Sequence, residues 1–312
     1  MKKYFLFLLS MILLLASCEK FKTDAVTGRE FLLRQGPTTQ HFGSGVTEFT
    51  GANGMSIKVH EPFISLETGD TLSGNPEFSI VEYSDKTDML FAGLPTVSAN
   101  NLIVTGGAFR LTGFIEGEAV RPSSVEFFVP AEAENVNMQA FVGETSADGE
   151  FNWLPVIPPS QIAEVPFWWA DTSALGSGGS GYQGFMTLNE FWYSNESLYI
   201  NCDYFLDENI PLTDVSVRPS SESNFSSIQI SVSMLFQTEN AYMQGNFNTQ
   251  SDMYEFYNVP IGYEVTCLGV GVDNNQELYF GMLDLEVEEN GVYTFTMEPI
   301  TEQELEDILD GL

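Results

Sequence analysis

The sequence predicts an all-β protein of two antiparallel β-sandwich domains, with a short helix in the first domain and a short C-terminal helix. From Val46 onward, short runs of alternating apolar and polar residues recur between turn residues, at the spacing of ~8–12 residues typical of sandwich strands. The 312 residues suffice for about two domains of ~100–200 residues each. A composition that is 43% hydrophobic and 13% aromatic indicates a packed core, because disordered acidic chains lack such residues.

The N-terminus has the pattern of an export signal. Lys2 and Lys3 precede the apolar run 4–14, which is too short for a permanent membrane span. The run ends in Leu15-Ala16-Ser17-Cys18, which resembles the lipobox of bacterial lipoproteins. The resemblance implies that residues 1–17 are a cleaved signal peptide and that the Cys18 thiol accepts a diacylglycerol, so that Cys18 carries acyl chains such as palmitate. An ordinary signal peptide with a chance cysteine is the alternative.

The residue after Cys18 bears on which membrane holds the anchor. An Asp there favours inner-membrane retention in some bacteria, so Glu19 favours the bacterial outer membrane. Two or three acyl chains, at about 0.8 kcal/mol per buried CH₂, give a stable anchor. Whether the anchored protein faces the periplasm or the cell surface stays open. No other run approaches ~18 uninterrupted apolar residues, so we expect no transmembrane segment.

The first half of the mature chain divides into a tether and a domain. Residues 18–44 are polar and of mixed charge, as expected for a tether, and residues 45–157 form the predicted N-terminal β-sandwich. Within it, residues 84–95 predict a short helix. Ser84 or Asp85 provides the N-cap, and a Gly-x-Pro sequence ends the helix.

The second half begins with a Gly/Trp-rich segment, 158–184, which we interpret as inter-domain. Residues 185–300 form the predicted C-terminal β-sandwich, and 301–312 an amphipathic helix. Thr301 and Glu304 form a capping box, and the apolar stripe of this helix predicts that it packs on the last sheet. The strands expected in the second domain span residues 185–191, 197–205, 214–218, 227–237, 241–247, 253–257, 263–272, 278–287 and 291–298.

Several segments together resemble one family. The segments 71–82, 88–97 and 106–109 resemble the N-terminal domain of uncharacterised envelope lipoproteins of the Bacteroidota type. The segment Ile200-Asn201-Cys202-Asp203-Tyr204-Phe205 resembles that family's W-I-N-C-D-R-F motif, with Tyr at the Trp and Arg positions. Residues 259–266 are also similar to a hairpin of carboxypeptidase regulatory-like, transthyretin-type β-sandwiches. The resemblance implies a fold and an envelope location, and it supplies no catalytic residues.

The charge is strongly negative and uneven. The chain has 44 acidic and 11 basic residues, a net charge of −33, and ten of the basic residues lie at or before Arg121. Such a surface repels phosphate backbones, so no nucleic-acid partner is expected. We interpret the acidic surface as solubilising, with cation binding as the alternative.

The candidate calcium ligands lie near strand ends and lack EF-hand spacing, so no metal and no cofactor are predicted. These candidates are Asp203, Asp207, Glu208, Asp214, Asp273 and Glu277.

Catalytic constellations are scarce in the sequence. The two histidines, His41 and His60, have no partners at zinc-ligand spacing and no serine elbow for a triad. We therefore predict a non-enzymatic protein with a structural or binding role toward a protein or polysaccharide partner. An envelope hydrolase acting on glycans or peptides is the alternative, and it requires two carboxylates in one cleft.

Two further sets of residues are candidates for specific roles. Trp168, Trp169 and Tyr182 lie in a Gly-rich context and offer flat faces on which a sugar or a partner could stack; the alternative is a hydrophobic plug between the domains. Cys202 and Cys267 lie in predicted strands. In the oxidising envelope they form either a disulfide or two buried thiols.

Overall fold

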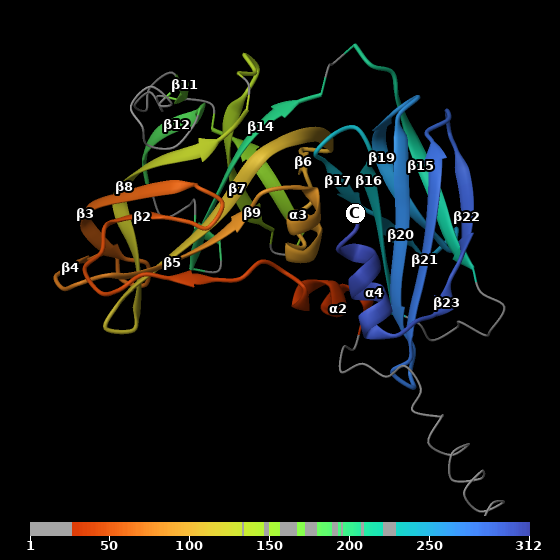
Figure 1. Ribbon diagram of the computed structural model, residues 1–312, viewed down its shortest axis with the longest axis horizontal. Helices are drawn as coiled ribbons and strands as arrows, with labels where there is room; N and C mark the ends of the chain where they lie inside the picture. The colour runs from red at the N-terminus through yellow and green to blue at the C-terminus, as the bar shows by residue number, and fades with distance from the viewer. Residues whose placement is uncertain are drawn as a thin grey trace, which may run out of the picture.

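The computed structural model describes residues 27–132, 134–146, 150–156, 167–171, 180–188, 193–194, 196–206, 209–220 and 229–312. The described part is mostly β, with the short helices α2 (Gly28–Arg34), α3 (Lys86–Ala92) and α4 (Glu302–Leu309) (Figure 1). The predicted signal peptide and Cys18 lie outside the described residues. Among the residues described, no helix is long and apolar enough to cross a membrane.

The first strands of the chain form one branched arrangement, which we call the large sheet. Its main path runs β10-β9-β14-β7-β8-β12-β11, and all its pairings are antiparallel. Its strands are β1 (Gln40–His41), β2 (Glu48–Thr50), β3 (Ser56–Ser65), β4 (Thr71–Leu72), β5 (Glu77–Tyr83), β6 (Val97–Ser98), β7 (Asn101–Ile115), β8 (Glu118–Pro130), β9 (Gln139–Thr145), β10 (Phe151–Pro155), β11 (Phe167–Asp171), β12 (Ser180–Thr187), β13 (Tyr193–Ser194) and β14 (Ser197–Phe205).

Strands β7 and β8 divide the large sheet into two layers. They pair with each other only beside their connecting turn, at Phe114–Ala119 and Ile115–Glu118. Beyond that turn β7 pairs with β5 and β14, whereas β8 pairs with β3 and β12. Buried residues from both layers, such as Phe109 of β7 and Phe127 of β8, pack in one hydrophobic cluster. The alternating burial of these strands thus encloses a core between the layers.

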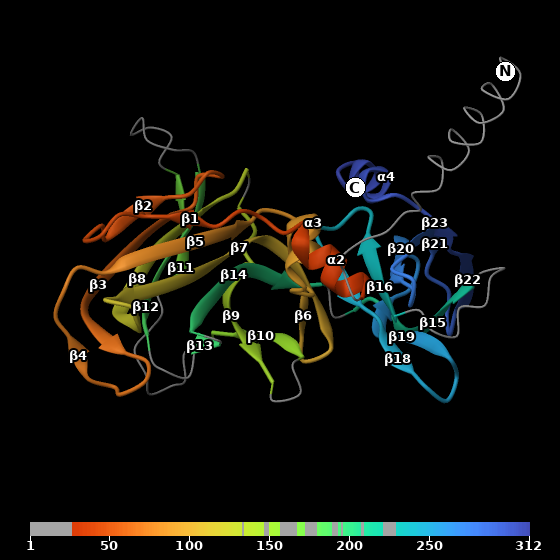
Figure 2. The same cartoon turned by 90° about the horizontal axis from the view of Figure 1, so that it is seen from below.

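The C-terminal part contains two smaller sheets (Figures 1 and 2). A second cluster, including Val217, Phe256, Met234 and Cys267, fills the space between them. The pairing of β15 with β22 is parallel, so the four-stranded sheet is mixed and not purely antiparallel as predicted. The four-stranded sheet contains β15 (Leu212–Ser220), β18 (Asn246–Asn248), β19 (Met253–Pro260) and β22 (Val292–Thr296), and the five-stranded sheet contains β16 (Gln229–Phe236), β17 (Tyr242–Gln244), β20 (Glu264–Val272), β21 (Leu278–Glu286) and β23 (Glu298–Pro299).

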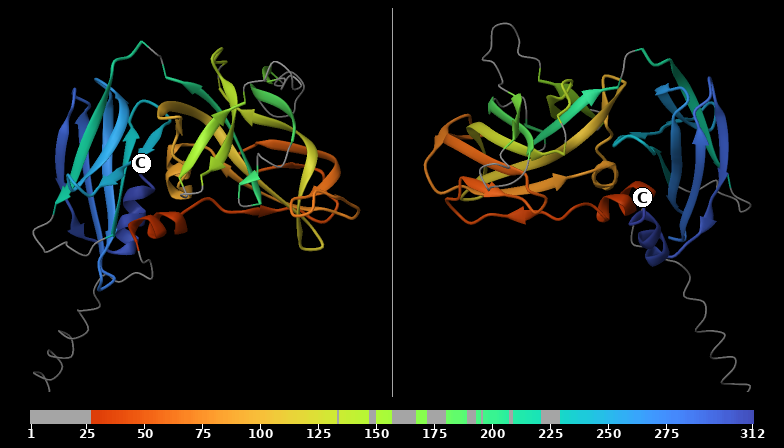
Figure 3. Two further views of the ribbon diagram at one scale, coloured as in Figure 1. Left: turned by 180° about the vertical axis from the view of Figure 1, so that it is seen from behind. Right: turned by 45° about the horizontal axis from the view of Figure 1, so that its top comes forward.

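The other face of the five-stranded sheet packs against the rest of the molecule. Strand β20 is buried on both faces, with Cys267 in the cluster just described and Leu268 and Val270 in a third cluster. We call this third cluster the junction core. It also contains residues of the large sheet, including Phe141 and Trp153, and of all three described helices. Figure 3 shows α2, α3 and α4 between the large sheet and the five-stranded sheet.

The predicted inter-domain segment and the start of the second domain need correction. Strand β12, within and beyond the segment 158–184, pairs with β8. Strand β14, placed by the sequence in the 185–300 domain, lies between β7 and β9 of the large sheet. The large sheet therefore continues to Phe205. Strand pairing over such long sequence separations leaves no signal in the local pattern, which is why the predicted boundary fell too early.

Two of the helices were predicted and one was not. The helix expected in 84–95 is α3, capped by Asp85. The expected C-terminal helix is α4, whose capping box is formed and whose Leu305 and Leu309 pack in the junction core beside the five-stranded sheet. The tether prediction for 18–44 is corrected by α2, which buries Phe31 and Leu32 in the same core.

Helix α2 has a clear local cause. Thr27 and Glu30 form a capping box, the same signal that marks α4. The helix lies directly on β20: a Cβ added at Gly28 would lie 1.8 Å from the carbonyl oxygen of Val270. Only glycine permits this approach, so Gly28 fixes α2 against the sheet.

Candidate functional site

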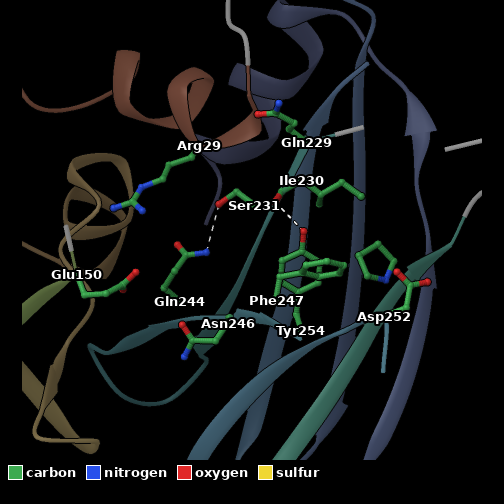
Figure 4. Close-up of a pocket in the computed structure, with 12 residues that line it drawn as sticks. Arg29, Glu150, Gln229, Ile230, Ser231, Gln244, Asn246, Phe247, Asp252 and Tyr254 are labelled. Carbon is green, nitrogen blue, oxygen red and sulfur yellow. Dashed lines mark hydrogen bonds between the residues drawn. The ribbon is translucent and has the colours of Figure 1, made fainter. Parts of the chain in front are cut away.

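A hollow of about 720 Å³ opens where helix α2, one end of the large sheet and the two smaller sheets meet (Figure 4). Arg29 of helix α2, Glu150 just before β10, and residues of the two smaller sheets all contribute to its wall. The volume falls within the ~300–1,000 Å³ range of small-ligand sites. The lining residues are Arg29, Glu150, Pro219, Gln229, Ile230, Ser231, Gln244, Gly245, Asn246, Phe247, Asp252 and Tyr254.

The chain crosses from one small sheet to the other at the wall of this hollow. Gln244 ends β17 of the five-stranded sheet, and Asn246 begins β18 of the four-stranded sheet. A Cβ at the intervening Gly245 would lie 2.9 Å from the ring of Phe256, so the crossing requires glycine. The sequence predicted one continuous strand over 241–247, and this break corrects it. As a result, two neighbouring amide side chains line the hollow.

The amide of Gln244 is held in one orientation. Its Nε2 donates to the Val232 carbonyl oxygen at 2.8 Å and to Ser231 Oγ at 3.3 Å, while its Oε1 accepts from Ser233 Oγ at 3.3 Å. Figure 4 shows Gln244 and Ser231 joined by one of these bonds. Fixed polar groups give a binding site its specificity, because they do not have to be ordered when the ligand arrives.

An aromatic pair forms the other side of the hollow. The ring of Phe247 is 51% exposed and lies 5.1 Å from the ring of Tyr254 at an angle of 49°. The Tyr254 hydroxyl donates to the Ile230 carbonyl oxygen at 2.8 Å. Burial raises the pKa of Tyr254 to about 12, so this hydroxyl remains a donor at physiological pH. The bond anchors Tyr254, which in turn supports the exposed Phe247 ring.

Charged groups lie at the periphery of the hollow. Figure 4 shows Arg29 of α2 and Glu150 on one side and Asp252 on the opposite side, with the amides and aromatic rings between them. A guanidinium offers donors in a planar fork, and each carboxylate offers acceptors. The hollow therefore presents donors, acceptors and an apolar face together.

A second hollow of about 330 Å³ extends the first. It shares Glu150, Gln244 and Asn246 with the larger one, and we call the two together the junction groove. Its own lining adds Tyr257, whose side chain is 39% exposed. The Tyr257 hydroxyl donates to Glu255 Oε2 at 2.5 Å, and this bond raises the pKa of Tyr257. The junction groove thus carries an exposed aromatic ring in each hollow.

The aromatic residues predicted from the sequence lie elsewhere. Trp168 and Trp169 lie on β11, and Tyr182 lies on β12. Trp168 is 44% exposed, but Trp169 packs edge-on against Tyr182 at 5.1 Å beside the core of the large sheet, and Tyr182 is buried. The three residues therefore do not form one exposed platform. They do not form an inter-domain plug either, since this core lies within the large sheet.

The positions of Cys202 and Cys267 decide between a disulfide and two buried thiols. Cys202 and Cys267 are free and buried, and they belong to two different hydrophobic clusters. No disulfide joins them. Burial raises the pKa of both thiols, to about 12 for Cys267, so they behave as small apolar side chains.

The candidate metal ligands do not converge in the described structure. No group of three or more His, Cys, Asp and Glu side chains suited to a metal ion occurs among the described residues. Asp273 Oδ1 accepts from the backbone N–H groups of Asn275 and Glu277, which closes a turn. His60 contacts Glu126 at 2.8 Å. Asp207 and Glu208 lie outside the described residues.

The comparisons with known proteins identify no family. No protein-family model and no curated protein matches the chain. Among solved structures, the crystal structure of listeriolysin O matches 80% of this chain at 6% sequence identity, with a TM-score of 0.18. The chain spans 49% of the listeriolysin O chain. An overlap this weak does not define a shared fold.

Most residues of the junction groove were missed by sequence reasoning. They come from α2, from the stretch between α3 and β7, from Glu150 and β10, and from strands β15 to β19, which are far apart in sequence. The capping box at Thr27 was a usable signal for α2 and hence for Arg29. Gly245, between two amide residues in an otherwise apolar strand, was a second usable signal.

Proposed function

We propose that the protein is a lipid-anchored, non-enzymatic binding protein of the bacterial outer membrane, built from two β-sandwich domains, and that it binds a polysaccharide in the junction groove. The lipobox-like sequence ending in Cys18 and the resemblance to envelope lipoproteins support the anchor and the location. The observation that carries the binding role is the exposed Phe247 ring beside the exposed amide of Asn246 and the fixed Gln244 Oε1, which can accept one more hydrogen bond.

The groove is better suited to sugars than to a protein surface. Sugar rings present an apolar face, which packs on an aromatic ring, and hydroxyl groups, which pair with amide donors and acceptors. Protein-binding surfaces are usually flatter, with an apolar centre and a polar rim. The net charge of −33 disfavours acidic polysaccharides. We therefore propose an uncharged glycan as the ligand.

The binding proposal is tested by Phe247→Ala in the full chain, using a panel of neutral and acidic polysaccharides in affinity electrophoresis. We expect retardation by a neutral polysaccharide, weakened at least about tenfold in the variant because the loss of an anchoring aromatic residue typically costs more than ~1–2 kcal/mol of binding.

Trp168→Ala is the matched control, because Trp168 is an exposed aromatic residue outside the groove. It should bind like the wild type. Loss of binding in Trp168→Ala with normal binding in Phe247→Ala would contradict the groove assignment, and no binding to any polysaccharide would contradict the function.

The anchor is tested separately by Cys18→Ala. If Cys18 carries the lipid, the wild type should incorporate labelled palmitate and remain with membranes, whereas the variant should incorporate none. Equal incorporation in both would contradict the lipoprotein assignment.

A glycan hydrolase is the second candidate, because Glu150 and Asp252 both line the larger hollow and hydrolysis of a glycoside requires two carboxylates. We favour binding because both residues are exposed, whereas the general acid of a glycosidase lies in apolar surroundings that keep it protonated. Shortened oligosaccharides released from the retained polysaccharide, and lost in Glu150→Gln, would establish the hydrolase instead.

A further inference from the structure

A group of buried polar residues lies where β7 and β14 pair, and the junction groove does not use it. It contains Thr105, Asn201 and Asp203, the last two within the Ile200–Phe205 segment discussed above. Side chains two residues apart on a strand share a face, and Asp203 lies directly opposite Thr105. All three side chains therefore project to the same side, opposite to Cys202, and we call them the β7–β14 triad.

The three side chains are in direct contact. Thr105 Oγ1 donates to Asn201 Oδ1 at 2.8 Å, and Asn201 Nδ2 donates to Asp203 Oδ2 at 2.5 Å. The Gly107 backbone N–H donates to Thr105 Oγ1 at 3.1 Å. The Thr105 hydroxyl, the Asn201 carboxamide and the Asp203 carboxyl group thus form a chain of hydrogen bonds, in which the hydroxyl contacts the carbonyl oxygen of the carboxamide.

The three side chains are shielded from bulk solvent. Thr105 is 4% exposed, and Asn201 and Asp203 are 0% exposed. The turn between β16 and β17 covers Thr105. The Thr105 backbone N–H donates to the Asn240 carbonyl oxygen, and Asn240 Nδ2 donates to the Thr105 carbonyl oxygen, both at 2.9 Å. Among the described atoms, Asp203 Oδ1 has no hydrogen-bond partner.

The carboxyl group of Asp203 is suited to proton transfer. Burial raises the pKa of this group well above its usual range. The group is therefore a neutral acid with one oxygen against the Asn201 nitrogen and one oxygen without a partner. A neutral carboxyl group can donate a proton from one oxygen while accepting one at the other.

We propose that Thr105 and Asn201 become joined by an ester bond, with Asp203 as the acid that transfers the proton. Thr105 Oγ1 bonds to the Asn201 side-chain carbonyl carbon, and the bond from that carbon to Nδ2 breaks. Asp203 protonates the departing nitrogen and regains a proton from the Thr105 hydroxyl, so the products are one ester and one ammonia molecule. No external reactant or oxidant is required.

Two features of the site favour this reaction. The reacting groups are held together by the fold, which removes the entropic cost of bringing them together. The three side chains are shielded from bulk water, which would otherwise compete with the hydroxyl and hydrolyse the ester. The resulting bond would join β7 to β14 covalently beside the junction core.

Mass spectrometry of the purified full chain tests the proposal. We expect the intact mass to be lower by one ammonia molecule than the mass calculated for the mature chain from Cys18 with its lipid, and proteolysis to release one peptide that joins the segments containing Thr105 and Asn201. Treatment of the denatured protein with hydroxylamine should separate the two segments. The full mass calculated for the mature, lipidated chain, or loss of ammonia with the two segments unjoined, would overturn the proposal.

Variants assign the roles. Thr105→Val and Asp203→Asn should each retain the full mass calculated for their sequence. Thr112→Val is the matched control, because Thr112 makes a hydroxyl contact across the same two strands, to Ser197 Oγ at 2.9 Å, and not to an amide. It should still lose one ammonia. If a triad variant does not fold, the wild-type mass and the joined peptide still decide the outcome.

Discussion

The two faces of the five-stranded sheet differ in what covers them. One face packs on the four-stranded sheet, whose strands lie between Leu212 and Thr296 and thus come from the same part of the chain as the five-stranded sheet. The other face packs on the junction core, assembled from α2, α3, α4 and the large sheet. The first face is covered by local chain, and the second by segments up to about 240 residues away in sequence, as between Phe31 and Val270.

This difference shows how the molecule is held together. A sheet with one solvated face needs only alternating apolar residues, as in β15, where Thr213, Val215 and Val217 are buried and the residues between them are exposed or half-buried. Strand β20 is apolar on both faces, so it requires a second cover. The junction core supplies that cover, and the junction groove forms at its edge. The same packing therefore unites the parts and shapes the candidate site.

The largest expected effect comes from weakening the packing of α2 on the second face of the five-stranded sheet. Phe31→Ala deletes a buried ring of the junction core, and we expect a loss of about 3–5 kcal/mol in the free energy of unfolding, measured by chemical denaturation. Leu33→Ala, on the exposed side of the same helix, should cost about 0.5 kcal/mol or less. Equal losses in both variants would mean that α2 is not an integral part of the core.

A smaller effect is expected at the polar contacts across the junction. Lys86 Nζ donates to the carbonyl oxygens of Phe236 and Glu239, and partial burial lowers the pKa of Lys86. Lys86→Met keeps the aliphatic stem and removes these bonds, so we expect a loss of about 1 kcal/mol in a denaturation experiment. The exposed Lys58 is the control: a similar loss in Lys58→Met would show that the effect is not specific to the junction.

The smallest effect concerns the cap of α4. Hydrogen bonds from the side chain and backbone of Thr301 lower the pKa of Glu304. A carboxylate with a lowered folded pKa stabilises the helix above its ordinary value of ~4.3, and this stabilisation is lost as the pH falls through the folded value.

We therefore expect the carbon-α chemical shifts of the first turn of α4 to move toward coil values on acidification below about pH 4. In Glu304→Gln, which keeps the side-chain amide oxygen as an acceptor, this movement should be absent. The same pH profile in both proteins would contradict the role of the Glu304 carboxylate.

Some features could be predicted because their causes are local. The alternating pattern over 263–272 and 278–287 identified β20 and β21, and the capping signals at Asp85 and Thr301 identified α3 and α4. The aromatic site could not be predicted in the same way. Trp168 and Trp169 stood out by type and by their Gly-rich context, but exposure depends on what a strand packs against, and Trp169 lies against the core of the large sheet.

The sequence by itself determined the strand-rich composition, the two capped helices and the acidic surface, because periodicity, caps and charge are properties of neighbouring residues. Only the tertiary structure decided that β14 lies between β7 and β9, that α2 covers β20, and that Gln244 and Phe247 meet Arg29 at one groove. These arrangements depend on contacts between distant segments, whose free energy comes from burying apolar faces together and leaves no periodic trace in the chain.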